Sequence, residues 1–285
     1  MLPDLPDFDR SFLPILDEAF REHADKICTT FAGEDLTYAD VDAISARVAN
    51  ALHRDGFSPG DFGAVYAANS ATAFVVALGI VRAGGVWVPL NPRNSPATNT
   101  EILARFGCRV LFHQPAFAAV ASDIAGATRA ALVPIDHGPA NSLEQWLDDV
   151  PATTPSVGRS GSDTLLLPQT GGTTGTPKGV MLSHRNFVAL AWAGRQNASG
   201  GQRAVLCAAP MTHVGGRAAL VSLGQGVRLV ILATPDPTSI LETIERERIT
   251  DVFLPPTAIY SLLDHPDTPN TDFSSLQRFA YGSAP

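Results

Sequence analysis

Short apolar runs alternate with stretches of helical periodicity along most of this chain, and this alternation limits the fold more than any other feature. The runs with the composition of buried strands are residues 62–67, 86–88, 109–113, 164–167, 204–208, 227–232, 251–254 and 278–281. The helical stretches are residues 37–56, 70–82, 97–106, 143–147, 183–196, 215–223, 237–247 and 256–263. Strands that alternate with helices predict an α/β architecture with mostly parallel sheets.

Several of these helices carry their own start signals. Thr37 and Asp40 have the spacing of a capping box, in which an acid stands where glutamate is more usual. Ser70 can cap the next helix. Asp236 followed by Pro237 is a favourable N-cap and first helical residue. The helical stretches therefore rest on local chemistry as well as on periodicity.

The totals of the sequence exclude several classes of protein. The chain has 285 residues, of which 45% are hydrophobic, and this is enough for one large or two ordinary globular domains. The net charge is −8 and lysine and arginine form no block, so we do not expect nucleic acid as a partner. Cys28, Cys108 and Cys207 lie far apart without a CxxC pair, which indicates reduced thiols of a cytoplasmic protein.

The sequence contains no pattern typical of a membrane segment. The N-terminal residues MLPDLPDFDR lack the basic start and the apolar core of a signal peptide. The most apolar window, residues 71–90, is interrupted by Arg82, Gly84, Gly85 and Pro89. It is therefore interpreted as a buried helix followed by a buried strand, and we expect no transmembrane segment.

A loop rich in glycine and threonine follows the strand predicted at 164–167, within the stretch LLLPQTGGTTGTPKGVML of residues 165–182. Its glycines allow a ligand to approach the backbone closely, and successive N–H groups can form a concave anion site. The residues that can contribute are Thr170, Gly171, Gly172, Thr173, Thr174, Gly175, Thr176 and Lys178. Hydrogen bonds to a charged group contribute about 1.5–3 kcal/mol each. Three or four of them would hold a triphosphate although the chain as a whole has a negative net charge.

Three familiar kinds of glycine-rich segment do not match this stretch. A flexible linker is disfavoured because a strand is predicted before the loop and a helix after it. A Walker-type P-loop needs glycine before its lysine and serine or threonine after it, whereas Lys178 stands between Pro177 and Gly179. The loop also lacks the GxGxxG pattern of dinucleotide-binding proteins. A polyphosphate site of another kind is therefore predicted.

The segment TGGTTGTPKGVMLSH closely resembles the phosphate loop of the AMP-forming adenylating enzymes, which include acyl- and aryl-CoA synthetases, luciferases and peptide-synthetase adenylation domains. Further segments resemble this superfamily in the same order along the chain. They are LTYADVDAISARVANAL (36–52), GIVRAGGVWVPLNPR (79–93), APMTHVGG (209–216), FLPPTAIYSLL (253–263) and YGSAP (281–285). The resemblance covers residues 30 to 285.

The resemblance implies two half-reactions. A carboxylate attacks the α-phosphorus of ATP to give an acyl-adenylate and pyrophosphate, and a thiol, usually that of CoA, then displaces AMP. It assigns the β- and γ-phosphates to Thr170, Gly171, Gly172, Thr173, Thr174, Gly175 and Lys178. Mg²⁺ is implied as a cofactor, with Thr170 as a candidate ligand, and the adenine pocket is assigned to Gly282, Ser283, Ala284 and Pro285.

The histidine segment bears on the acid substrate. His213 occupies the position that in acyl-CoA synthetases lies beside the carboxylate, and here it is the candidate catalytic residue. Peptide-synthetase domains usually carry aspartate in this segment, so the resemblance favours a fatty or other acyl acid over an amino acid. Arg217, one turn later, is interpreted mainly as an exposed helix residue, with a second substrate carboxylate as the alternative. His184, in the first turn of the predicted helix after Ser183, is interpreted as structural or as a residue that supports the site without contacting the substrate.

The resemblance also implies how the chain is organised. We expect an α/β fold of two mostly parallel sheet subdomains with flanking helices, one at about 60–195 and an incomplete one at about 10–59 plus 196–285. The family's β-barrel and C-terminal lysine-bearing domain are expected to be absent. An open sheet edge and a risk of self-association follow from this. The alternative function is a non-catalytic fragment that binds a nucleotide or an acyl group, or a remnant of such a ligase.

Overall fold

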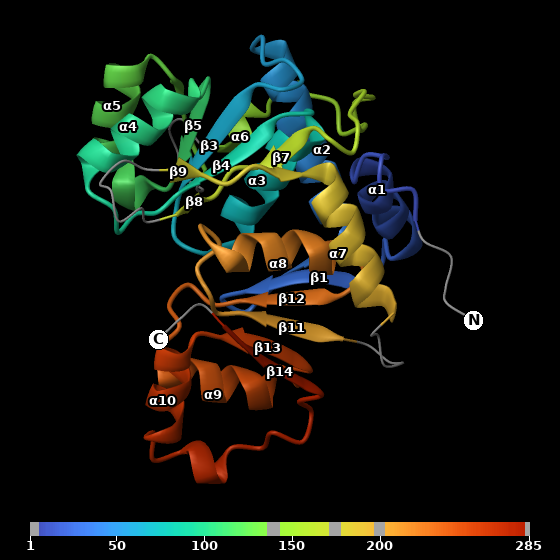
Figure 1. Ribbon diagram of the computed structural model, residues 1–285, viewed down its shortest axis with the longest axis vertical. Coiled ribbons are helices and arrows are strands. Elements are labelled where there is room, and N and C mark those ends of the chain that lie inside the picture. The colour runs from blue at the N-terminus through green and yellow to red at the C-terminus, as the bar shows by residue number, and fades with distance from the viewer. Residues whose placement is uncertain (1–5, 136–142, 171–177, 197–202, 283–285) are drawn as a thin grey trace.

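Two six-stranded sheets, one above the other, organise the computed structural model of the chain (Figure 1). The structure describes residues 6–135, 143–170, 178–196 and 203–282. A separate antiparallel pair joins β8 (Gln169–Thr170) to β9 (Lys178–Gly179). The predicted α/β fold, with two mostly parallel sheets and flanking helices, is confirmed.

The first sheet is formed by the middle of the chain. Its strands are β3 (Phe62–Tyr66), β4 (Val86–Leu90), β5 (Val110–His113), β6 (Ala131–Pro134), β7 (Thr164–Leu166) and β10 (Leu182–Ser183). They lie in the order β10-β7-β4-β3-β5-β6. All neighbours are parallel except β10, which runs antiparallel to β7. In the central register, Ala64 pairs with Val88 on one side and with Leu111 on the other.

The second sheet combines the start of the chain with its last part. Its strands are β1 (Ile27–Phe31), β2 (Glu34–Thr37), β11 (Ala204–Cys207), β12 (Arg228–Ile231), β13 (Asp251–Leu254) and β14 (Arg278–Tyr281). They lie in the order β14-β13-β11-β12-β1-β2, and only β2 is antiparallel to its neighbour. The N-terminal hairpin therefore completes a sheet whose other strands come from residues beyond 200.

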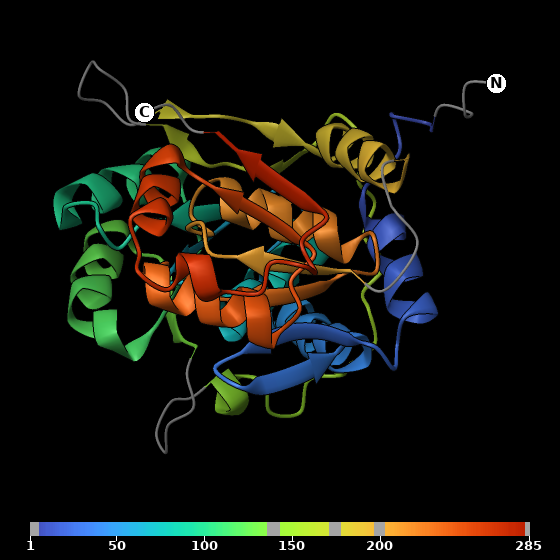
Figure 2. The same ribbon diagram turned by 90° about the horizontal axis from the view of Figure 1, so that it is seen from below.

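The helices form layers around and between the sheets (Figures 1 and 2). They are α1 (Leu13–Glu22), α2 (Tyr38–Arg54), α3 (Ala71–Arg82), α4 (Pro96–Phe106), α5 (Ala118–Thr128), α6 (Leu143–Trp146), α7 (His184–Gln196), α8 (Val214–Leu223), α9 (Pro237–Arg246) and α10 (Pro256–Leu263), with short 3₁₀ turns at Pro115–Phe117 and Thr268–Asn270. Three clusters of buried side chains follow from this layering. One lies between the sheets with α2, α3 and α8, and one lies on each outer face, under α4 with α5 and under α9 with α10.

Local signals position the central helices as the sequence predicts. The Thr37 hydroxyl accepts from the Asp40 N–H at 3.1 Å, and the Asp40 carboxylate accepts from the Thr37 N–H at 2.8 Å, so the capping box is confirmed. The Ser70 and Asp236 caps are confirmed as well. Both helices thus begin at fixed points directly after the loops that follow β3 and β12.

A buried arginine ties three helices together. Arg82 on α3 is 2% exposed, and its Nη2 lies 2.6 Å from Asp42 on α2 and 3.7 Å from Asp17 on α1. The guanidinium also donates to the Ser45 hydroxyl. Burial of one charge is tolerated here because two carboxylates and a hydroxyl surround it.

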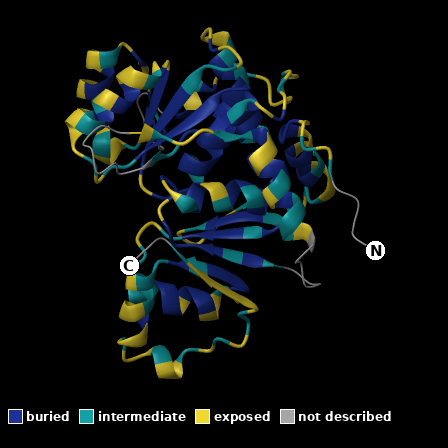
Figure 3. Cartoon of the chain, in the orientation of Figure 1, coloured by how far each residue is buried: buried dark blue, intermediate teal, exposed yellow. Residues whose placement is uncertain are grey.

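One edge of the second sheet is open. On β14, Phe279 is 46% exposed and Tyr281 is 75% exposed, and Tyr260 and Leu263 of α10 also face solvent. Figure 3 colours the β14 strand as exposed. The predicted exposed apolar edge is therefore present. Self-association through this edge, like the predicted limits of the two subdomains, stays a prediction. Among the residues that the structure describes, the helices are too short or too polar to cross a membrane.

Candidate functional site

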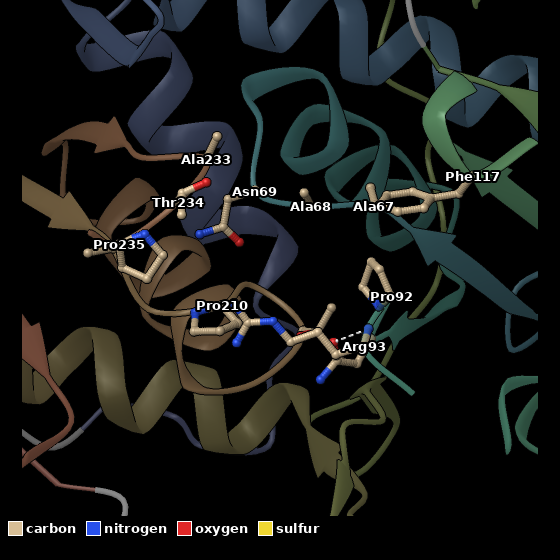
Figure 4. A pocket seen from close by; sticks show the side chains of 13 residues that line it. Ala67, Ala68, Asn69, Pro92, Arg93, Phe117, Pro210, Ala233, Thr234 and Pro235 are labelled. Carbon is tan, nitrogen blue, oxygen red and sulfur yellow. Dashed lines mark hydrogen bonds between the residues drawn. The ribbon is translucent and has the colours of Figure 1, made fainter. Parts of the chain in front are cut away.

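The carboxyl ends of the parallel strands of both sheets meet at one cavity of about 320 Å³ (Figure 4). Its walls come from the loops that directly follow β3, β4, β11 and β12, and they include Ala67–Asn69, Asn91–Arg93, Pro210, Thr212 and 233–235. In open α/β sheets, ligands bind outside the carboxyl ends of the strands. This carboxyl-end cavity is therefore the candidate site.

Asn69 fixes the floor of the carboxyl-end cavity by joining the two sheets. Its Nδ2 donates to the carbonyl oxygens of Ala209, at 3.1 Å, and Leu232, at 3.2 Å. Its Oδ1 accepts from the Met211 N–H at 2.8 Å. One buried amide thus satisfies three backbone groups that would otherwise lack partners, and it holds the loops after β3, β11 and β12 in one arrangement. The sequence reasoning missed this residue.

His213 stands at the border of the carboxyl-end cavity, where it precedes α8 as the N-cap residue. Its Nε2 lies 3.3 Å from Nδ2 of Asn91. Because Oδ1 of Asn91 accepts from the Arg93 N–H at 2.9 Å, the amide presents its NH₂ group to the histidine. Nε2 therefore accepts, and the imidazole is neutral with its proton on Nδ1. Partial burial lowers the pKa of His213 below its ordinary value, although the residue keeps a solvent-exposed face.

Arg93 brings a positive charge to the carboxyl-end cavity. Figure 4 shows its side chain extending from the loop after β4 toward the region of Pro210. Among the described residues, its guanidinium has no carboxylate partner. A guanidinium suits the planar, two-point recognition of carboxylate or phosphate. The sequence reasoning did not single out Arg93 or Asn91 as site residues, although both lie in the segment 79–93 that resembles the family.

The base of the glycine-rich loop is a short antiparallel ladder. Thr170 on β8 pairs directly with Lys178 on β9, and Gln169 pairs with Gly179. A side chain at Gly179 would approach Phe106 to 2.9 Å, so the ladder lies tightly against α4. Lys178 is exposed and forms no ion pair with the described part of the chain. The structure thus brings Thr170 and Lys178 together, as expected of the two ends of an anion-binding loop.

The rest of the predicted phosphate and adenine sites lies outside the described residues. This applies to Gly171, Gly172, Thr173, Thr174, Gly175, Ser283, Ala284 and Pro285. Gly282 is described and follows β14, where an added Cβ would lie 3.3 Å from the ring of Phe253. The side chain of Thr170, the candidate Mg²⁺ ligand, is not described either. The described residues contain no group of three or more acidic, histidine or cysteine side chains that could hold a metal.

A narrow apolar crevice of about 30 Å³ lies between α8 and the second sheet. Its lining comes from small residues of α8, from β11 and β12, and from Phe253 on β13. Gly215 allows this close approach, because an added Cβ there would lie 2.3 Å from the carbonyl oxygen of Ala209, which also lines the crevice. The crevice is apolar and offers nothing to a charged group, and its volume admits only a methyl-sized group. Arg217 of α8 is exposed and does not line either space.

His184 is structural, as the sequence reasoning interpreted it. It is fully buried at the start of α7, and its Nδ1 accepts from the Phe12 N–H at 3.2 Å and faces the Ser11 hydroxyl at 3.3 Å. Burial lowers the pKa of His184 to about 4. The ring is therefore neutral at physiological pH, and it fastens the N-terminal segment to α7 rather than to the carboxyl-end cavity.

Comparisons with known proteins agree with this geometry. Feruloyl-CoA synthase from Amycolatopsis sp is 35% identical over 260 residues, which cover 89% of this chain and 50% of that protein. The chain spans about half the length of the curated relatives that it matches. The N-terminal domain of FACL13 from Mycobacterium tuberculosis, solved with an inhibitor, has a TM-score of 0.87 at 25% identity, covering 97% of this chain and 70% of that chain. ATP-bound MatB from Rhodopseudomonas palustris has a TM-score of 0.82 at 28% identity, covering 95% and 55%.

One protein-family model matches nearly the whole sequence. The model described as AMP-binding enzyme matches residues 16–285, which include both sheets, the β8–β9 ladder and the segment around His213. This chain therefore belongs to the family of AMP-binding enzymes.

Proposed function

We propose that this chain is the ATP- and acid-binding portion of an AMP-forming ligase, which converts a carboxylic acid to an acyl-adenylate and then to a CoA thioester. The observation that carries the proposal is the carboxyl-end cavity, which is lined by loops of both sheets and by Arg93 and Asn91, with His213 in contact with Asn91 beside it. Family membership and the CoA ligases among the relatives support it. The chain spans about half of those relatives, so the proposal concerns the longer protein that contains it.

In the first step, a carboxylate oxygen of the acid forms a bond to the α-phosphorus of ATP, and the bond from that phosphorus to the bridging oxygen of pyrophosphate breaks. The pairing of Lys178 with Thr170 at the base of the loop supports a role for its ammonium group in neutralising the departing phosphates. Mg²⁺, when bound, would share that charge. The protein accelerates such a transfer chiefly by positioning the two reactants and by stabilising charge.

The acid is expected to place its carboxylate near His213 and its apolar end toward the crevice under α8, whose volume of about 30 Å³ admits a methyl-sized group. A neutral imidazole with its proton on Nδ1 can donate one hydrogen bond without adding a charge that would trap the carboxylate. The crevice walls are apolar, so a fatty or other acyl acid fits better than an amino acid, whose ammonium group would be buried without a partner. Arg93 is available for an anionic group of either substrate.

Exchange of pyrophosphate into ATP tests the proposal, with the longer polypeptide that contains this chain and a panel of fatty and aryl acids. We expect exchange that depends on one class of acid. His213→Ala should raise the KM for that acid or lower kcat, whereas His265→Ala, in the loop after α10, should leave both near wild type. Lack of exchange with every acid would contradict the ligase. Tight ATP binding in the same protein would then favour the non-catalytic nucleotide-binding alternative.

A further inference from the structure

A second cavity, of about 370 Å³, lies at the other edge of the first sheet. Arg109 directly precedes β5 and Ala130 directly precedes β6, and both line it, so this amino-end cavity lies where the strands begin. The carboxyl-end cavity lies where β3 and β4 end. The strands β5 and β6 have four residues each, so their amino and carboxyl ends lie about 13 Å apart. The two cavities are therefore separate sites.

The floor of the amino-end cavity is apolar. Leu52 and Phe57 from the end of α2 and Val110 from β5 line it, and all three are at most 5% exposed. The indole of Trp146 on α6 forms one side, where its ring packs edge-on against Phe112. A ligand that fills this space must bring an apolar body to cover these groups.

The rim of the amino-end cavity has an excess of positive charge. Arg109 lies at the rim, and its Nε is 3.4 Å from the Asp61 carboxylate. Arg129 also lies there, and it has no side-chain partner among the described residues. The one acid in the lining, Asp55, already accepts from Arg54 at 2.8 Å and from the indole N–H of Trp146 at 2.8 Å. Those bonds satisfy the carboxylate, so within the described ranges the guanidinium of Arg129 has no acidic partner.

The backbone at Arg129 supports a role for its side chain. The residue ends α5 with φ of 63°, in the left-handed region that glycine occupies without strain. Ala32 shares this conformation without a side chain that could bind a ligand, so the backbone supports a role at Arg129 only together with the place of its side chain in the cavity lining. The turn directs an arginine to the rim of a cavity where glycine would fit the backbone better.

We propose that the amino-end cavity binds an organic anion with an apolar body, such as a medium-chain carboxylate. Its head group pairs with Arg109 and Arg129, and its body covers Leu52, Phe57 and Val110. This site is independent of the proposed ligase function, because it uses no residue of the carboxyl-end cavity or of the β8–β9 ladder.

The test follows the indole N–H resonance of Trp146 in the ¹⁵N-labelled chain during titration with octanoate, with Trp146→Phe to assign that resonance. Trp87, packed against the Gly216 turn of α8, reports on the other side of the sheet. We expect a saturable shift of the Trp146 resonance. Arg129→Gln or Arg109→Gln should weaken binding at least tenfold, because each removes a charged hydrogen-bond donor. The matched control Arg105→Gln, on exposed α4, should bind as wild type does.

Three further measurements separate specific recognition of an amphipathic anion from binding of its apolar or charged half alone. We expect 1-octanol and inorganic phosphate to bind at least tenfold more weakly than octanoate, because each supplies one half of the recognised chemistry. Arg129→Gly should lose octanoate binding while its Tm stays at or above the wild-type value. The proposal is wrong if octanoate shifts only the Trp87 resonance or none, if octanol or phosphate binds as tightly, or if the arginine variants behave like Arg105→Gln.

Discussion

A fall in pH should lower the stability of the protein through one buried histidine, His184, which joins the N-terminal segment to α7. Burial lowers the pKa of His184 to about 4, whereas an exposed histidine in the unfolded chain titrates near about 6.5. The unfolded state therefore binds more protons than the native state across this interval, and stability falls as the pH falls through it. Below about pH 4 both states carry the proton, and the loss stops growing.

The magnitude follows from the two pKa values. Between pH 7 and pH 5 the unfolded chain takes up most of a proton that native His184 refuses, which costs about 2 kcal/mol of stability. The structural reason is specific. A protonated ring would turn Nδ1 into a donor facing the Phe12 N–H, which now donates to it at 3.2 Å. The other nitrogen, Nε2, is buried without a hydrogen-bond partner in the described part of the chain.

Urea unfolding at pH 7 and pH 5 measures this loss, with wild type and His184→Gln compared at each pH. The variant should be less stable at pH 7 but should lose about 2 kcal/mol less than wild type on acidification. Ser11→Ala is the matched control, because it removes the hydroxyl at Nδ1 and leaves the ring buried. It should lower stability at both pH values and keep the wild-type pH dependence. Equal pH dependence in wild type and His184→Gln would refute the reasoning.

Three further outcomes are expected. Asn91→Ala should raise the pKa of His213 in an NMR titration, because the amide that donates to Nε2 stabilises the neutral ring, and an unchanged or lower pKa would contradict the assigned tautomer. Gly216→Ala should lower the free energy of unfolding by about 1–3 kcal/mol, since its Cβ would overlap the Met211 carbonyl and lie 2.5 Å from the Trp87 ring. An unchanged Tm would show that α8 is packed more loosely. Asp42→Asn should cost about 1–3 kcal/mol, as it removes the carboxylate nearest the buried guanidinium of Arg82, and urea unfolding that matches wild type would show that Asp17 alone suffices.

The sequence predicted the elements that are buried on both sides or capped by local chemistry. The β3 and β4 strands are continuous apolar runs, and the helices after Thr37, Ser70 and Asp236 begin where their caps indicate. The sequence reasoning assigned no element before Thr37, so it missed α1 and β1 although both have buried side chains. The other elements that it missed are exposed or short. The β2 strand, EDLT, has no buried side chain, and the turn before it depends on Ala32 at φ of 53°. In the α5–β6 region, alanine-rich sequence gives a weak period, and Ala131 and Leu132 of β6 stay exposed at the sheet edge.

The residues of the candidate site also differ in how far the sequence alone can identify them. The sequence reasoning could propose His213 and Lys178 as site residues because they stand in motifs that can be read along the chain. Asn69 was not, because its three hydrogen bonds reach Ala209, Met211 and Leu232, and their proximity depends on how the two sheets stack. Local pattern therefore finds the residues of a loop motif, whereas residues that join two sheets emerge only from the tertiary structure.

Equilibrium binding of ATP and AMP to this chain and to Lys178→Ala tests the central claim most directly, by calorimetric titration in the presence of Mg²⁺. The claim is that the loop anchored by Thr170 and Lys178 grips the terminal phosphates of ATP. We predict that the variant binds ATP at least tenfold more weakly than wild type, because a charged hydrogen bond is lost, while its affinity for AMP changes little. Equal losses for ATP and AMP, or wild-type affinity for ATP, would contradict the account.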